Sequence, residues 1–166
     1  MNKLIILFCF VSFSVFGQNV SKYYVANHQS DGILYFIYPL SLFEERGNGD
    51  LTIDITYKTK SDSATVNFTY CQKGMTVADS VSFNGTSGLV ISGIPQNLYL
   101  EAKKLPNWEH RYSLTVPFKQ LSSLFASKSS FNICIYSQGK QLIYSPKRGW
   151  EKHANIIHTI LDMAQL

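Results

Sequence analysis

The sequence is poor in charged residues and in cysteine. Only 16% of its residues are charged, and the formal net charge is +4 at pH 7. This charge is too small and too dispersed to predict a nucleic-acid partner or binding to anionic lipid. With three cysteines in 166 residues, the chain is not a disulfide-dense scaffold, and its length is sufficient for a hydrophobic core without a structural metal.

Recognisable catalytic motifs are missing as well. The sequence contains no G-x-S-x-G elbow, no H-E-x-x-H motif, no C-x-x-C pair and no phosphate-binding loop. Because a catalytic triad is assembled in space from distant positions, these absences weaken the case for an enzyme without excluding one. We therefore expect a non-catalytic protein without cofactor or metal, and a hydrolase of an unrecognised family remains an alternative.

The N-terminal segment predicts export. A positively charged start precedes an apolar run from Leu4 to Val15, and the small residue Gly17 precedes the expected cleavage point. The run is shorter than the roughly twenty residues that a transmembrane helix needs. The leader resembles those of bacterial envelope proteins. We expect residues 1–17 to be a signal peptide and residues 18–166 to form one β-rich domain, secreted or periplasmic, with no membrane span.

Short alternating runs of apolar and polar residues follow the leader. The runs Leu51–Thr59 and Ser63–Cys71 alternate strictly on either side of the polar connection Lys60–Asp62. This pattern predicts antiparallel hairpins with one buried and one solvated face. The predicted strands are Ser21–Ala26, Ile33–Tyr38, Leu51–Thr59, Ser63–Cys71, Val77–Phe83, Leu89–Ser92, Leu98–Lys103, Arg111–Val116, Ser130–Ser137 and Lys140–Ser145.

Two segments have helical periodicity instead. Pro117–Phe125 has apolar residues three and four apart, behind a proline suited to a first helical turn. From Trp150 to the C-terminus, apolar residues fill about half of a helical wheel. We therefore expect a mainly β fold, an antiparallel sheet or a two-layer β-sandwich, with one short helix and a C-terminal amphipathic helix packed on it.

The terminal helix also carries histidines that could act as ligands. His158 and Asp162 are four residues apart on its polar face, and we favour a solvated pair because two ligands do not make a metal site. His153 falls inside the apolar arc, where a histidine at the edge of the core is more common than a buried base.

Two cysteines remain after removal of the leader. Cys71 and Cys134 each lie in a predicted strand and point away from its main apolar face. An oxidising compartment permits them to pair. The sequence leaves two outcomes open, a Cys71–Cys134 disulfide across one sheet surface or two separate free thiols.

Aromatic side chains are the candidate binding residues. Trp108 lies at a loop-to-strand junction, where an exposed indole could stack on a sugar or hold a peptide and a buried one would close the end of the core. Tyr99 and Tyr112 complete the candidate set. The expected function is a binding or interaction role at the cell envelope, with an unidentified protein or glycan partner. A carbohydrate- or peptide-binding module with exposed aromatics is the alternative.

Tyr35 and Tyr38 could extend this aromatic platform. Both faces of their run, Ile33–Tyr38, are apolar. Such a run predicts a central strand that is buried on both sides, which weakens both tyrosines as exposed contacts.

Overall fold

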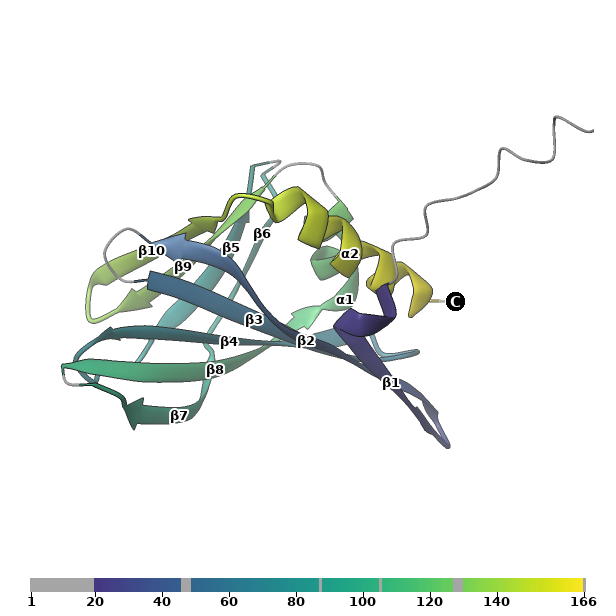
Figure 1. Ribbon diagram of the computed structural model, residues 1–166, viewed down its shortest axis with the longest axis horizontal. Coiled ribbons are helices and arrows are strands. Elements are labelled where there is room, and N and C mark those ends of the chain that lie inside the picture. Colours follow the sequence, from purple (N-terminus) through teal and green to yellow (C-terminus); the bar gives the residue numbers. More distant parts are fainter. Residues whose placement is uncertain (1–19, 46–48, 87, 105, 127–129, 166) are drawn as a thin grey trace, which may run out of the picture.

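The structure is a computed structural model that describes residues 20–45, 49–86, 88–104, 106–126 and 130–165. The predicted signal peptide lies outside these residues. Figure 1 shows a curled antiparallel sheet with two helices lying next to each other against it. The predicted mainly β fold with a short helix and a C-terminal helix is therefore confirmed.

The elements follow one another in the order η2 (Val20–Tyr23), β1 (Tyr24–Gln29), β2 (Gly32–Glu45), β3 (Gly49–Lys58), β4 (Ser63–Lys73), β5 (Ser80–Gly85), β6 (Val90–Gly93), β7 (Gln96–Ala102), β8 (Asn107–Pro117), α1 (Phe118–Ala126), β9 (Phe131–Ser137), β10 (Lys140–Pro146) and α2 (Trp150–Met163). The ten strands form one sheet in the order β6-β5-β9-β10-β2-β3-β4-β8-β7, and β1 pairs with β2 beside this path. None of the helices in the described part of the chain is long and apolar enough to cross a membrane.

A tight corner brings the two ends of the sheet together. β6 and β7 are the terminal strands of the sheet order, yet only Ile94 and Pro95 separate them along the chain. A Cβ atom at Gly93 would lie 2.9 Å from Leu114 Cδ1 on β8. Glycine therefore permits the close approach of β6 to β8, and the sheet curls around its own buried face.

The predicted alternation determines which face is buried. Along β3 and β4, every second residue from Leu51 to Tyr57 and from Ala64 to Tyr70 is buried. The C-terminal helix begins after Gly149, whose positive φ of 86° suits the turn into α2. Trp150 then enters the core, with its ring centroid 5.1 Å from that of Phe43, as the helical periodicity predicts.

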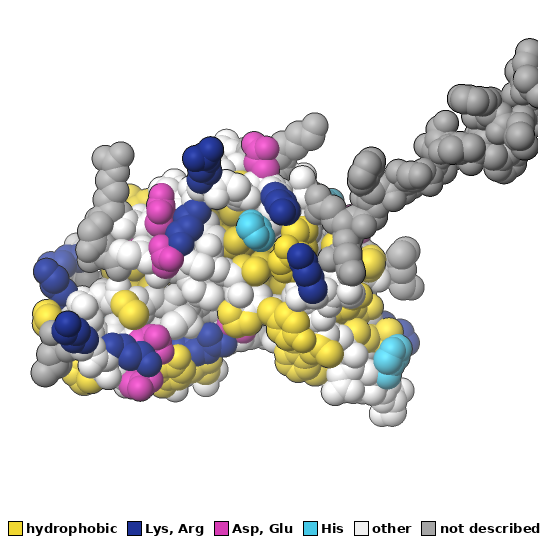
Figure 2. All heavy atoms as spheres, viewed as in Figure 1, with side chains coloured by type: hydrophobic (Ala, Val, Ile, Leu, Met, Phe, Trp, Pro, Cys, Tyr) yellow, Lys and Arg dark blue, Asp and Glu magenta, His cyan; other side chains and the backbone are white. Residues whose placement is uncertain are grey.

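One strand differs clearly from its prediction. Phe36 and Tyr38 on the outer face of β2 are 38% and 46% exposed, so the prediction that Ile33–Tyr38 is buried on both faces was wrong. Only the inner face, with Ile37, packs into the core. Alternation reports whether a face is apolar, but not whether another element covers it. Figure 2 shows hydrophobic side chains exposed where the first hairpin meets the body of the protein.

Several segment boundaries also shift, and β2 and β8 are longer than predicted. The chain from Val20 to Tyr23 forms a 3-10 helix, so the first strand begins three residues later than the predicted Ser21–Ala26. Gly74–Asp79 is a loop across one end of the curled sheet, and β5 starts only at Ser80. Interior side chains hold this loop, because Tyr112 Oη accepts a hydrogen bond from Ala78 N and Ser137 Oγ donates to Val77 O.

Candidate functional site

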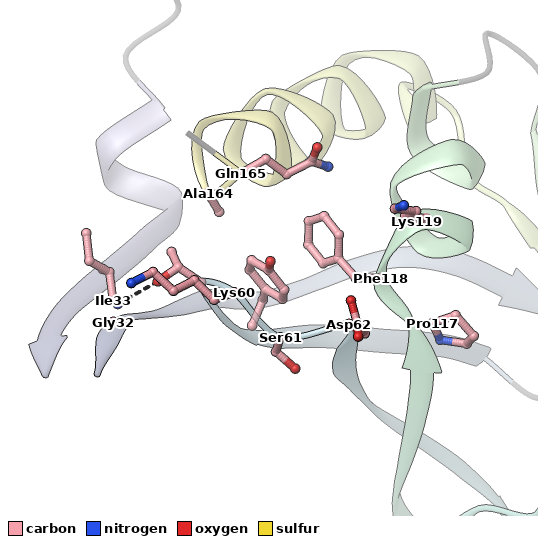
Figure 3. A pocket seen from close by; sticks show the side chains of 12 residues that line it. Gly32, Ile33, Lys60, Ser61, Asp62, Pro117, Phe118, Lys119, Ala164 and Gln165 are labelled. Atoms are coloured by element: carbon pink, nitrogen blue, oxygen red, sulfur yellow. Dashed lines mark hydrogen bonds between the residues drawn. The ribbon is translucent and has the colours of Figure 1, made fainter. Parts of the chain in front are cut away.

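A pocket of about 760 Å³ opens between the β3–β4 turn, the start of β2, the beginning of α1 and the end of α2 (Figure 3). Its volume lies in the range of small-molecule sites, which are roughly 300–1,000 Å³. Four segments that are far apart in the sequence contribute to its wall. Its geometry therefore depends on the contacts that hold these segments together.

The floor of the pocket is a pair of stacked aromatic rings. The rings of Tyr57 and Phe118 have centroids 3.8 Å apart and planes inclined by 30°. Tyr57 is the last buried residue of β3, and Phe118 is the first residue of α1. Phe118 N donates a hydrogen bond of 2.9 Å to Asp62 O, which anchors the start of α1 to the β3–β4 turn.

The rim beside β2 is held by one side-chain hydrogen bond. Thr59 Oγ1 accepts from Ile33 N at 2.9 Å. Gly32 makes this approach possible, because it has a φ of 147° and a Cβ there would lie 2.6 Å from the same oxygen. The turn and the start of β2 therefore form one rigid edge of the pocket.

The charged groups of the pocket are Lys60, Asp62 and Lys119. No carboxylate oxygen among the described residues lies within 4.0 Å of either lysine amino group. Burial, together with the negative charge of Asp62, raises the pKa of Tyr57 above its ordinary value of 10.0. Tyr57 is therefore a neutral hydrogen-bonding group at physiological pH.

The interior of the curled sheet contains a second cluster of aromatic rings. His110 is fully buried and stacks on Tyr70, with ring centroids 5.1 Å apart. Its Nε2–H donates to Gly74 O at 3.3 Å, and burial lowers its pKa below 6.5. His110 is thus a neutral imidazole that anchors the Gly74–Asp79 loop. Strand alternation places it on the same face as Trp108, but the sequence contains no signal for its complete burial.

The predicted binding aromatics do not converge. Trp108 is half-buried at the end of the inner face of β8, and Tyr112 is completely buried farther along that face. Tyr99 lies on the opposite face, where its hydroxyl donates to Glu109 Oε1 at 2.9 Å. Tyr38 lies on β2, which β3, β4 and β8 separate from the strand of Tyr99. These rings therefore do not form a common platform.

The two cysteines are free thiols. Cys71 lies on β4 and Cys134 on β9, with β10, β2 and β3 between these strands. Burial is the main cause that raises the pKa of the Cys71 thiol. Cys134 Sγ accepts a hydrogen bond from Asn84 Nδ2 at 3.2 Å. Of the two outcomes left open by the sequence, the structure contains the separate thiols.

The histidines of α2 occupy ordinary positions. His158 Nε2 lies 3.4 Å from Asp162 Oδ2 at the surface, and His153 Nδ1 lies 3.3 Å from the carbonyl oxygen of Gly149. Within the described ranges, no three histidine, cysteine, aspartate or glutamate side chains come together as a metal-binding group.

The sequence contained parts of the pocket without revealing their proximity. The polar connection Lys60–Asp62 and the helix start at Pro117 were both recognisable. Only the antiparallel pairing of β4 with β8, which places Ser63 opposite Pro117, brings them together. Because Ser63 and Pro117 are more than fifty positions apart, local periodicity does not predict their pairing.

The geometry defines a mainly antiparallel β protein with one open, partly apolar pocket beside its helices. No protein-family model matches the sequence, and the comparisons with curated proteins and with solved structures each found no match. A functional hypothesis therefore depends on the chemistry of the pocket itself.

Proposed function

We propose that this chain is an exported, non-catalytic binding protein of the cell envelope, and that the pocket beside Tyr57 and Phe118 binds a small ligand. The observation that carries the proposal is the stacked aromatic floor in a pocket of about 760 Å³. Export rests on the sequence of the leader. The binding role rests on a concave, partly apolar site with a few polar groups, which is the usual composition of ligand pockets.

The floor is well suited to binding because it is already ordered. Tyr57 and Phe118 are only 5% and 4% exposed, so the surrounding structure already fixes both rings and a ligand does not need to immobilise them. The hydrogen bonds from Phe118 N to Asp62 O and from Ile33 N to Thr59 Oγ1 fix the surrounding backbone. Pre-organisation of this kind increases affinity, since less conformational entropy is lost on binding.

A matched pair of variants tests the proposal. Phe118→Leu removes the flat ring from the floor, while Phe125→Leu removes a buried ring of the same helix that packs against Trp150 outside the pocket. Each should lower the free energy of unfolding by roughly 1–2 kcal/mol. Backbone-amide NMR with a mixture of small aromatic and aliphatic compounds should show binding at residues 59–62 and at residues 118 and 119.

The two variants should then differ in ligand binding alone. We expect the signal to persist in Phe125→Leu and to disappear in Phe118→Leu. If no compound in the mixture perturbs the pocket, or if both variants bind equally well, the assignment of the pocket as the ligand site is wrong.

A further inference from the structure

We infer that the ligand of this pocket is an amphipathic anion, whose apolar body lies on Tyr57 and Phe118 and whose single negative group is neutralised by the rim lysines. This inference rests on the proposed function, because it names the class of ligand for the same site. It depends on the charge of Lys60 and Lys119 and on the local conformation in which the fold holds each of them.

Lys60 and Lys119 lack a direct ion-pair partner among the described residues. No carboxylate oxygen there lies within ion-pair distance of either amino group, although Asp62 lines the same pocket. Other described lysines, such as Lys104 and Lys152, are also without an ion pair. Lys58 chiefly, and Lys60 to a smaller extent, lower the pKa of the nearby Asp31 carboxyl. The pocket therefore contains two positive side chains and one negative one, next to an apolar floor.

Lys119 lies where the helix itself disfavours a cation. It is the second residue of α1, and the first turn of this helix contains no acidic residue. The N-terminus of a helix carries a partial positive charge, so a lysine there is unfavourable and an anion is favourable. Lys119 and the start of α1 together make this rim of the pocket electropositive.

Lys60 has a backbone conformation that a lysine adopts only at a cost. Its φ is 70°, in the left-handed region that glycine and asparagine occupy more readily. Strained residues of this kind are concentrated at functional sites. Two lysines that local folding preferences disfavour thus meet at the same pocket, and an anionic ligand gives both of them a role.

Asp62 limits the charge that the ligand can carry. Its carboxylate lies close enough to Tyr57 to raise the pKa of that phenol. Figure 3 shows Asp62 beside Pro117 below the Phe118 ring, with Lys119 above the ring and Lys60 on the far side near Ile33. A second negative group near Asp62 would be repelled, which favours a ligand with one anionic group on an apolar body.

Three probes of equal chain length test the sign of the charge: decanoate, decanol and decylammonium. Calorimetric titration of the full mature chain should show that decanoate binds most tightly and decylammonium most weakly. The double variant Lys60→Gln/Lys119→Gln should weaken decanoate binding by roughly fivefold or more, the amount expected for two partly exposed ion pairs, and should leave decanol unchanged. The double variant Lys104→Gln/Lys152→Gln, at two exposed lysines outside the pocket, is the charge-matched control and should have no effect.

The outcomes distinguish failure of the anionic ligand class from failure of the pocket as a binding site. If decanol binds as tightly as decanoate, or if the double variant keeps its full affinity for decanoate, the pocket binds ligands but the anionic class is wrong. If none of the three probes binds and the mixture of compounds described above also leaves the pocket unperturbed, both the anionic class and the binding role of the pocket fail.

Discussion

Tyr70 on β4 and Tyr144 on β10 face each other across the interior of the curled sheet, with ring centroids 5.7 Å apart although β2 and β3 lie between their strands. Both hydroxyl groups are buried, and that of Tyr144 has no hydrogen-bond partner among the residues that the structure describes, whereas that of Tyr70 lies close to the Tyr112 hydroxyl. Burial raises the pKa of each phenol far above its ordinary value. The contact between the two rings therefore links the two halves of the sheet through aromatic packing. Burial of the hydroxyl groups makes an unfavourable contribution to its free energy.

Removing the Tyr144 hydroxyl should stabilise the fold. An unsatisfied buried hydroxyl costs about 1–3 kcal/mol, so Tyr144→Phe should raise the free energy of unfolding by roughly 1 kcal/mol in urea denaturation. Tyr112→Phe is the control, because Tyr112 Oη accepts from Ala78 N at 2.9 Å and its loss should destabilise by about 1 kcal/mol. Destabilisation by Tyr144→Phe would show that another group satisfies that hydroxyl.

Protonation of His110 should make stability depend on pH. Burial lowers the pKa of His110 in the folded state below 6.5, so the unfolded chain binds the proton more readily. Stability should be constant above about pH 6.5 and should fall as the pH decreases from there through the lowered pKa of the folded state. Thermal unfolding between about pH 8 and pH 5.5, roughly above the range in which carboxylates titrate, would measure this loss.

Variants separate His110 from other titrating groups. Replacement of His110 by Gln should flatten the pH profile, whereas His28→Gln, at an exposed position on β1, should leave the profile unchanged. Asp31 and Asp50 have pKa values lowered from 3.8 by their lysine partners and therefore act at more acidic pH. An unchanged slope in His110→Gln would disprove the assignment.

Lys60 should show a conflict between stability and binding. Lys60→Gly relieves the left-handed conformation and should raise the free energy of unfolding by roughly 0.5–1 kcal/mol, while it weakens decanoate binding through the loss of a cation. Gln138→Gly is the matched control, because Gln138 has a φ of 49° in a turn outside this pocket. It should gain similar stability without a change in affinity. Equal affinity in both variants would remove Lys60 from the site.

Processing of the leader is a separate test, since export rests on the sequence alone. Expression of the full chain in a bacterium should yield an extracytoplasmic protein whose N-terminal residue is Gln18, measured by intact mass and N-terminal sequencing. Gly17→Arg should block cleavage because signal peptidases require a small residue there. An intact, unprocessed chain in the cytoplasm would contradict the proposed location.

Particular elements show how far local patterns extend. The alternation of β3 and β4, the turn between them and the helix from Trp150 were all predictable, because each depends on neighbours within a few positions. The exposure of the outer face of β2 was not predictable. The apolar residues Phe36 and Tyr38 indicate an apolar face, but they do not indicate whether another element covers it. The aromatic binding set failed to converge for a different reason, since alternation within one strand does not relate its faces to those of another: Tyr99 and Trp108 lie on opposite faces of the neighbouring strands β7 and β8, and Tyr112 is buried.

The amino-acid sequence by itself determined the β-rich class, the buried faces of β3 and β4 and the amphipathic terminal helix, because periodicity along the chain sets which side chains must leave water. Only the tertiary structure decided that β4 pairs with β8, that the sheet curls until Tyr70 meets Tyr144, and that Tyr57 and Phe118 share one pocket with Lys60 and Lys119. Such contacts join residues that are distant in the chain, and they are stable because many surfaces are buried at the same time. Local sequence patterns therefore do not predict them.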